Sequence, residues 1–173
     1  MSDRERAANA GEMVTASNMW TVKRRQKTAR IRRKDMSYKI FGDSCLDLTE
    51  ELKKDPRFEM IPLTLQVDDH MVIDDETFDQ KAFLKMIKES PNCPKTACPS
   101  PEAFKKACEC DADDVYIIAL SSHLSGTYNS AVLGKELYEE EHGKGSKNIL
   151  VIDSESASAG ELNEALAIRD MYE

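Results

Sequence analysis

Short apolar runs alternate with segments of helical periodicity from residue 38 to the end of the chain. The apolar runs predict four β-strands, at residues 37–42, 58–67, 115–120 and 148–153. Pro62, inside the second run, lacks a backbone N–H, so this run is expected at a sheet edge or at a strand start. The first strand is expected to stop at Asp43.

Segments with apolar residues at helical spacing separate these strands. Helices are predicted at 49–54, from Phe78 to about Ser90, from Ser100, at 127–141 and at 160–172. The helix that starts at Ser100 has a serine cap followed by proline at its first position. The proline-rich residues 92–100 are expected to form a loop.

This alternation predicts the fold class. Continuous apolar strands joined through helices are typical of a parallel sheet with helices on both faces, because right-handed crossovers place them there. We therefore predict an α/β, parallel-sheet, Rossmann-like three-layer domain. Ligands of such sheets bind beyond the carboxyl ends of the strands. Polar pairs follow three predicted strands: Asp43 with Ser44, Ser121 with Ser122, and Asp153 with Ser154.

Residues 119–131 are the most informative segment, because small hydroxyl residues and one glycine join an apolar strand to a helix. Unpaired backbone N–H groups at a helix start carry partial positive charge. Ser122, Ser125 and Thr127 add neutral hydrogen-bond donors. The segment therefore favours a bound carboxylate or phosphate. Ordinary helix capping and turn chemistry explain the same residues without a ligand.

Charge is divided unevenly along the chain. Residues 1–37 contain 10 Lys or Arg and 4 Asp or Glu, which gives a net charge of +6. Since the whole chain carries −8, residues 38–173 carry −14. The basic segment has few large apolar residues, so residues 1–37 are predicted to be a disordered leader. Such a tract is most simply a solvated tail, and we assign it neither a nucleic-acid nor a membrane partner.

Composition also indicates the compartment. No apolar stretch is long enough to span a bilayer, and the start lacks the apolar core of a secretory signal. The five cysteines form no Cys-x-x-Cys pair, and the three histidines are scattered. We expect a soluble, cytoplasmic protein with free thiols, no structural metal and no cofactor.

Motifs of the common enzyme classes are missing. There is no Gly-x-Ser-x-Gly elbow and no phosphate loop, and no second acid lies two residues after Asp43. This favours a binding protein over an enzyme. Two alternatives remain open: a small-molecule hydrolase or phosphotransferase that uses Asp43 or Cys98, with Lys95 close to the thiol in sequence, and a degenerate or partner-binding module in which the basic leader binds.

Five segments occur in an order and spacing that resemble the DegV family of bacterial fatty-acid-binding proteins: 43–48, 61–63, 94–100, 120–131 and 151–154. Leu124-Ser-Gly-Thr-Tyr is the most specific part. The resemblance runs from about residue 38 to residue 173. It implies that these residues form the N-terminal lobe of a two-lobed protein whose C-terminal lobe is absent from this chain.

The resemblance also implies a function. A long-chain fatty acid such as palmitate would lie between two lobes, and the protein would act as a carrier that presents the acid to a fatty acid kinase. By position, Thr96 and Ser125 would bind the carboxylate together with the Gly126 backbone N–H. Ser122 and Asp43 are possible additional contacts.

The sequence departs from the family pattern at three points. Ala97 and Cys98 replace the usual Ser and Gln beside Thr96, the basic leader has no counterpart, and the second lobe is missing. Without the second lobe the acyl chain has little apolar surface to bury, so this chain alone is expected to bind lipid weakly or not at all. An exposed apolar crevice would favour self-association.

Overall fold

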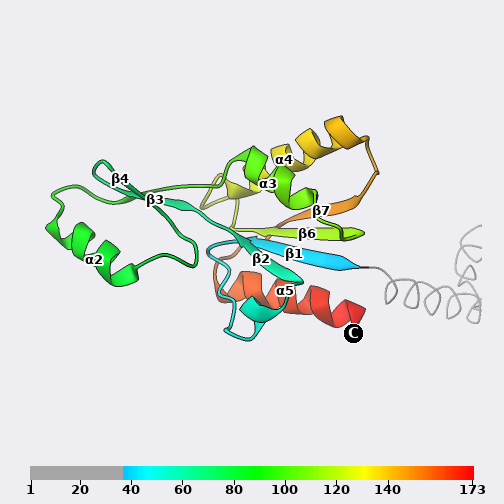
Figure 1. Cartoon of the computed structure of the whole chain (residues 1–173), viewed down its shortest axis with the longest axis horizontal. Helices are drawn as coiled ribbons and strands as arrows, with labels where there is room; N and C mark the ends of the chain where they lie inside the picture. The colour runs from blue at the N-terminus through cyan, green and yellow to red at the C-terminus, as the bar shows by residue number, and fades with distance from the viewer. Residues whose placement is uncertain (1–36) are drawn as a thin grey trace, which may run out of the picture. The chain divides into compact units, whose positions relative to one another are not determined.

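The computed structural model of the protein describes residues 37–173, and its central element is a four-stranded parallel sheet (Figure 1). The predictions for the basic leader lie outside these residues, apart from Ser37. The strand order is β2-β1-β6-β7. Its strands are β1 (Tyr38–Asp43), β2 (Phe58–Ile61), β6 (Asp114–Ala119) and β7 (Asn148–Asp153). The predicted parallel α/β fold class is confirmed.

Helices cover both faces of this sheet (Figure 1). On one face lie α3 (Pro101–Cys108) and α4 (Thr127–His142), and on the other lies α5 (Ala159–Tyr172). The core under α3 and α4 includes Phe41, Phe104, Val115 and Ile117. Because successive side chains of a strand point to opposite faces, the buried Ile40 and Ile118 belong to the other face. The two central strands, β1 and β6, are therefore buried on both sides, as the sequence predicted.

A second, antiparallel sheet was not predicted. Its order is β4-β3-β5, with β3 at Thr64–Val67, β4 at His70–Ile73 and β5 at Lys95–Ala97. The connection from β4 to β5 contains α2 (Gln80–Glu89). The single strand predicted at 58–67 is therefore wrong, because β2 and β3 belong to different sheets. The predicted loop at 92–100 is also wrong in part, because it contains β5.

The break between the two sheets occurs at Pro62 and Leu63. Pro62 cannot donate a backbone hydrogen bond, so β2 ends immediately before it. The Leu63 N–H donates to Ser44 Oγ at 3.1 Å, and the Leu63 carbonyl accepts from the Asp74 N–H at 3.0 Å. These bonds replace ladder pairing, so the chain leaves the parallel sheet and begins the second one.

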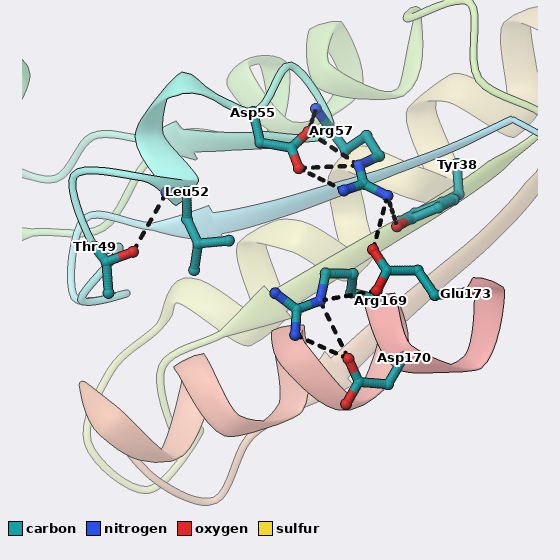
Figure 2. Close-up of polar contacts among 8 residues, drawn as sticks. All are labelled: Tyr38, Thr49, Leu52, Asp55, Arg57, Arg169, Asp170 and Glu173. Carbon is teal, nitrogen blue, oxygen red and sulfur yellow. Dashed lines mark hydrogen bonds and ion pairs between the residues drawn. The ribbon is translucent and has the colours of Figure 1, made fainter.

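A polar network joins α5 to the start of β1 and β2, at the edge of the sheet formed by the amino ends of the strands (Figure 2). The Arg57 guanidinium lies 2.6 Å from Asp55 and 3.5 Å from Glu173, and it donates to Tyr38 Oη at 2.7 Å. Hydrogen bonds from Arg57 hold the pKa of the Asp55 carboxyl below its usual value. The network stabilises the edge of the sheet that lies opposite the predicted ligand site. The short 3-10 helix η2 (Leu52–Lys54) directly precedes Asp55.

Gly134 allows α3 and α4 to approach closely. A Cβ atom at this position would lie 2.5 Å from Phe104 Cβ and 2.6 Å from the Pro101 carbonyl oxygen. Neither atom is the flexible end of a side chain, so the contact is not relieved without moving a helix.

We expect Gly134→Ala to lower the free energy of unfolding by about 1–2 kcal/mol net, because overpacking a core costs about 1–3 kcal/mol and these two contacts are severe. The higher helix propensity of alanine, worth about 1 kcal/mol, offsets only part of this cost. Urea denaturation measures the change. Asn129→Ala, at an exposed position of α4, is the matched control and should stay within about 0.5 kcal/mol. A Gly134→Ala protein as stable as its parent would contradict this account.

Among residues 37–173, no helix combines the length and the apolar character needed to cross a membrane. All five cysteines lie within this range and are free thiols.

Candidate anion-binding site

The candidate site is the loop between β6 and α4, and carboxylates from both neighbouring strands anchor it. The Leu120 N–H donates to Asp43 Oδ2 at 2.8 Å, at the end of β1. The Ser122 N–H donates to Asp153 Oδ1 at 3.0 Å, at the end of β7. The polar residues at three strand ends therefore meet at one edge of the sheet, as predicted. The two acids serve there as acceptors for the loop backbone.

The loop is also closed on itself. The Leu124 and Ser125 N–H groups both donate to the Ser121 carbonyl, at 2.9 and 3.0 Å. The Ser121 N–H donates to the Ser156 carbonyl at 3.0 Å, which links the loop to the segment before α5. With these donors satisfied inside the protein, the loop has a fixed shape before any ligand arrives.

The start of α4 provides donors for an anion. Ser125 Oγ accepts the Thr127 N–H at 3.2 Å and shares a hydrogen bond of 2.8 Å with Thr127 Oγ1. The first backward bond of the helix is that of the Ser130 N–H to the Gly126 carbonyl. N–H groups that precede it have no intrahelical acceptor and carry partial positive charge. Gly126 itself is exposed, so this end of the helix is accessible to a ligand.

Thr96 lies on the second sheet, in the middle of β5, and its side chain is exposed. The segment after it packs against the start of α4. A Cβ atom at Gly126 would lie 3.4 Å from Cys98 Sγ, and the Ser130 hydroxyl donates to the Pro99 carbonyl at 2.5 Å. The structure thus brings the Thr96 segment to the Ser125 loop. That both side chains bind one carboxylate stays a prediction.

Asp43 is buried and holds the backbone of neighbouring segments through hydrogen bonds. It is fully buried, and each carboxyl oxygen accepts a backbone N–H, from Leu120 at 2.8 Å and from Cys45 at 2.9 Å. A carboxylate that is buried and engaged in this way is poorly placed to attack a substrate or to contact a ligand. Ser122 is half-buried within the loop, and its role as an additional ligand stays a prediction.

Glu161 was missed by the sequence reasoning. It is fully buried in the first turn of α5, and neither carboxyl oxygen has a hydrogen-bond partner. Burial, followed by the charge of Asp43, raises the pKa of Glu161 to about 8. The nearby backbone N–H of Ser158 partly opposes this rise, although it makes no hydrogen bond of normal geometry with either oxygen. The sequence offered only a weak signal, an acid in the first turn of a helix, which is ordinary at exposed positions.

Several large apolar side chains are exposed near the loop and on the elements of the second sheet. Leu124 is 72% exposed in the candidate loop, and Met71 is 71% exposed on β4. Ile73 on β4 and Leu84 on α2 are also exposed. An apolar ligand or partner would gain free energy by covering such side chains.

A cleft of about 760 Å³ lies beside β2, away from the α4 start. Its wall includes the carboxylates of Asp47, Glu59, Asp74 and Glu76, against the single cation of Lys53. This charge disfavours an anionic head group, so the cleft is not the predicted site. Among the residues that the structure describes, no cluster of three or more His, Cys, Asp or Glu could hold a metal ion.

The fold and the loop define an α/β domain with a candidate anion site at the carboxyl ends of its strands. Residues 37–173 match the family described as "Uncharacterised protein, DegV family". The chain therefore belongs to the DegV family, which confirms the resemblance seen in its motifs.

Known relatives support the assignment. A DegV domain-containing protein of Streptococcus gordonii is 39% identical over 124 residues, which are 70% of this chain and 43% of the relative. A DegV family protein from Ruminococcus gnavus, solved with vaccenic acid, matches at 48% identity and a TM-score of 0.75, over 79% of this chain and 48% of that one.

A third similar protein is the Streptococcus pneumoniae Fatty Acid Kinase (Fak) B3 protein loaded with linoleic acid. It matches at 34% identity and a TM-score of 0.66, over 76% of this chain and 47% of its own length. The present chain thus spans less than half the length of each of these three proteins.

Proposed function

We propose that this chain binds the carboxylate of a long-chain fatty acid, as the head-group-binding part of a fatty-acid carrier. The observation that carries the proposal is the start of α4, where hydroxyl and backbone donors lie next to the segment that follows Thr96. Similar solved proteins support the ligand class, since they hold vaccenic and linoleic acids.

The hydrogen bonds around Ser125 are compatible with a hydroxyl group that donates to a ligand. If Thr127 donates both its N–H and its hydroxyl to Ser125 Oγ, the Ser125 O–H is left to donate to the ligand. Thr96 and the Gly126 N–H would supply the remaining donors. Hydrogen bonds to a charged acceptor are worth about 1.5–3 kcal/mol each, so these groups fix the position of the head group.

The acyl chain would supply most of the affinity, because each buried CH₂ contributes roughly 0.8 kcal/mol. Leu124 and the exposed residues of β4 offer part of that apolar surface. A further lobe, or a second copy of the chain through self-association, would supply the rest. Of weak binding and no binding, we therefore expect weak but measurable binding by this chain alone, with a lower affinity than that of a two-lobed relative.

We further propose that the chain is not an enzyme but hands its ligand to a kinase in the cytoplasm. The similarity to the Fatty Acid Kinase (Fak) B3 protein supports a kinase partner. The buried, doubly hydrogen-bonded carboxylate of Asp43 disfavours the alternative in which it attacks a substrate.

The proposal predicts that the purified full chain discriminates by head group. Palmitate should displace a fluorescent fatty acid at a concentration at least about tenfold lower than hexadecanol does, since the alcohol has the same tail and no charge. Displacement curves at pH 7 measure this ratio. Equal displacement by both compounds, or no binding of the fluorescent fatty acid at any accessible concentration, would overturn the proposed function.

A further inference from the structure

Behind the candidate loop lies a pair of fully buried carboxyl groups from different elements. Asp43, at the end of β1, is satisfied by two backbone N–H groups, whereas Glu161 of α5 has no hydrogen-bond partner for either oxygen. A buried carboxylate without a partner is strongly disfavoured relative to the neutral acid. The pair therefore differs from an ordinary surface cluster of acids.

The charged groups that face Glu161 are all acidic. They are Asp43 and Asp47, from the segment that ends β1 and follows it, and Glu164, one turn further along α5. One oxygen of Glu164 is also buried without a partner. Burial and the charges of Asp43 and Glu161 likewise raise the pKa of the Cys45 thiol, to about 12. In the part of the chain that the structure describes, Glu161 forms no salt bridge. Its carboxyl group is therefore neutralised by protonation and not by a basic side chain.

Asp43 and the segment before Glu161 are both connected to the candidate loop by hydrogen bonds. Asp43 accepts the Leu120 N–H at 2.8 Å. The segment before α5 accepts the Ser121 N–H through the Ser156 carbonyl, and Ser158 of that segment donates to Asp47. Ser158 has a φ of 57°, a positive value that a serine rarely adopts. Repulsion between Asp43 and an ionised Glu161 would therefore act on two supports of one loop.

We propose that Glu161 carries a proton when the chain holds its anionic ligand, and that release of this proton to solvent as the pH rises weakens ligand retention. This inference rests on the proposed function and adds a regulation to the same site. When Glu161 is deprotonated, Asp43 and Glu161 both carry a negative charge behind the loop that binds the anionic ligand. When Glu161 is protonated, only Asp43 carries a charge there. Protonation of Glu161 and binding of the anion therefore favour each other.

The test compares the full chain with Glu161→Gln, which mimics the protonated acid. Glu140→Gln, at an exposed position of α4, is the control for loss of one charge. Retention of a fluorescent fatty acid is measured from pH 6 to pH 9.5. Titration of the lipid itself is common to all three proteins, so only differences between them count.

We expect retention by the parent and by the control to fall about tenfold more over this range than retention by Glu161→Gln. Ligand-free urea midpoints should show the same contrast, with the parent declining between pH 6 and 8 and the glutamine variant staying flatter. Equal profiles for all three proteins would overturn the proposal.

A second measurement does not depend on the ligand or on the variant. The carboxyl titration of Glu161 in the parent chain, followed by carbon NMR, should have its midpoint near pH 8. A midpoint below pH 6 would overturn the proposal. If Glu161 titrates near pH 8 and the stability profiles differ as expected, but no lipid binds at any pH, the proposed function is refuted. The protonation of buried Glu161 would then still be supported.

Discussion

Replacing Thr96 with valine and Ser125 with alanine together should weaken fatty-acid binding about 100-fold. Each hydroxyl is expected to donate to the ligand carboxylate, and hydrogen bonds to a charged group are worth about 1.5–3 kcal/mol each. A combined loss of about 3 kcal/mol corresponds to this factor. Displacement of a fluorescent fatty acid from the full chain measures it.

Stability must be measured on the same proteins, because Ser125 Oγ also accepts the Thr127 N–H at the start of α4. Loss of this hydrogen bond should cost about 1 kcal/mol of the free energy of unfolding. Thr77→Val combined with Ser146→Ala removes two exposed hydroxyls elsewhere and should bind lipid like the parent. Unchanged affinity in the Thr96 and Ser125 double variant would refute the assignment of these residues to the head group.

The second large effect is expected at Asp43, where alanine should lower the free energy of unfolding by about 3 kcal/mol. The substitution removes the acceptor for the Cys45 and Leu120 N–H groups, and unsatisfied buried donors cost about 1–3 kcal/mol each. Relief of the repulsion with Glu161 offsets part of this loss. Urea denaturation at pH 7 is the measurement.

Asp111→Ala, at an exposed position just before β6, is the matched control and should change stability by less than about 0.5 kcal/mol. A further consequence of Asp43→Ala concerns Glu161. Since the negative charge of Asp43 contributes to the raised pKa of Glu161, its removal should lower that pKa. An Asp43→Ala protein as stable as the parent would show that the carboxylate does not anchor the loop.

The parallel sheet and its helices were predictable from residues 37–173. The apolar runs that became the central strands β1 and β6 are buried on both faces, and burial of this kind leaves a continuous apolar pattern in the sequence. Ser100 followed by Pro101 marked the start of α3 correctly, with Ser100 accepting the Ala103 N–H. These signals are local, so they can be read without knowing the fold.

The second sheet could not be predicted in the same way. Its strands β4 and β5 are short and largely exposed, so no alternation of apolar and polar residues marks them. β5 pairs with β3, which joins residues far apart in the chain, such as Thr64 with Ala97. Pro62 indicated a sheet edge or a strand start, but only the fold shows that one strand ends before it and that the chain changes sheets there.

The sequence by itself determined the fold class, the family and the segments that form the candidate loop, because hydrophobic period, cap residues and motif spacing act over short distances. Only the tertiary structure decided what Asp43 and Glu161 do. A hydrogen bond from Leu120 satisfies Asp43, 77 residues away in the chain, while Glu161 is buried beside it without a partner. The free energy of a buried charge depends on which groups surround it in space, and that arrangement exists only once the chain has folded.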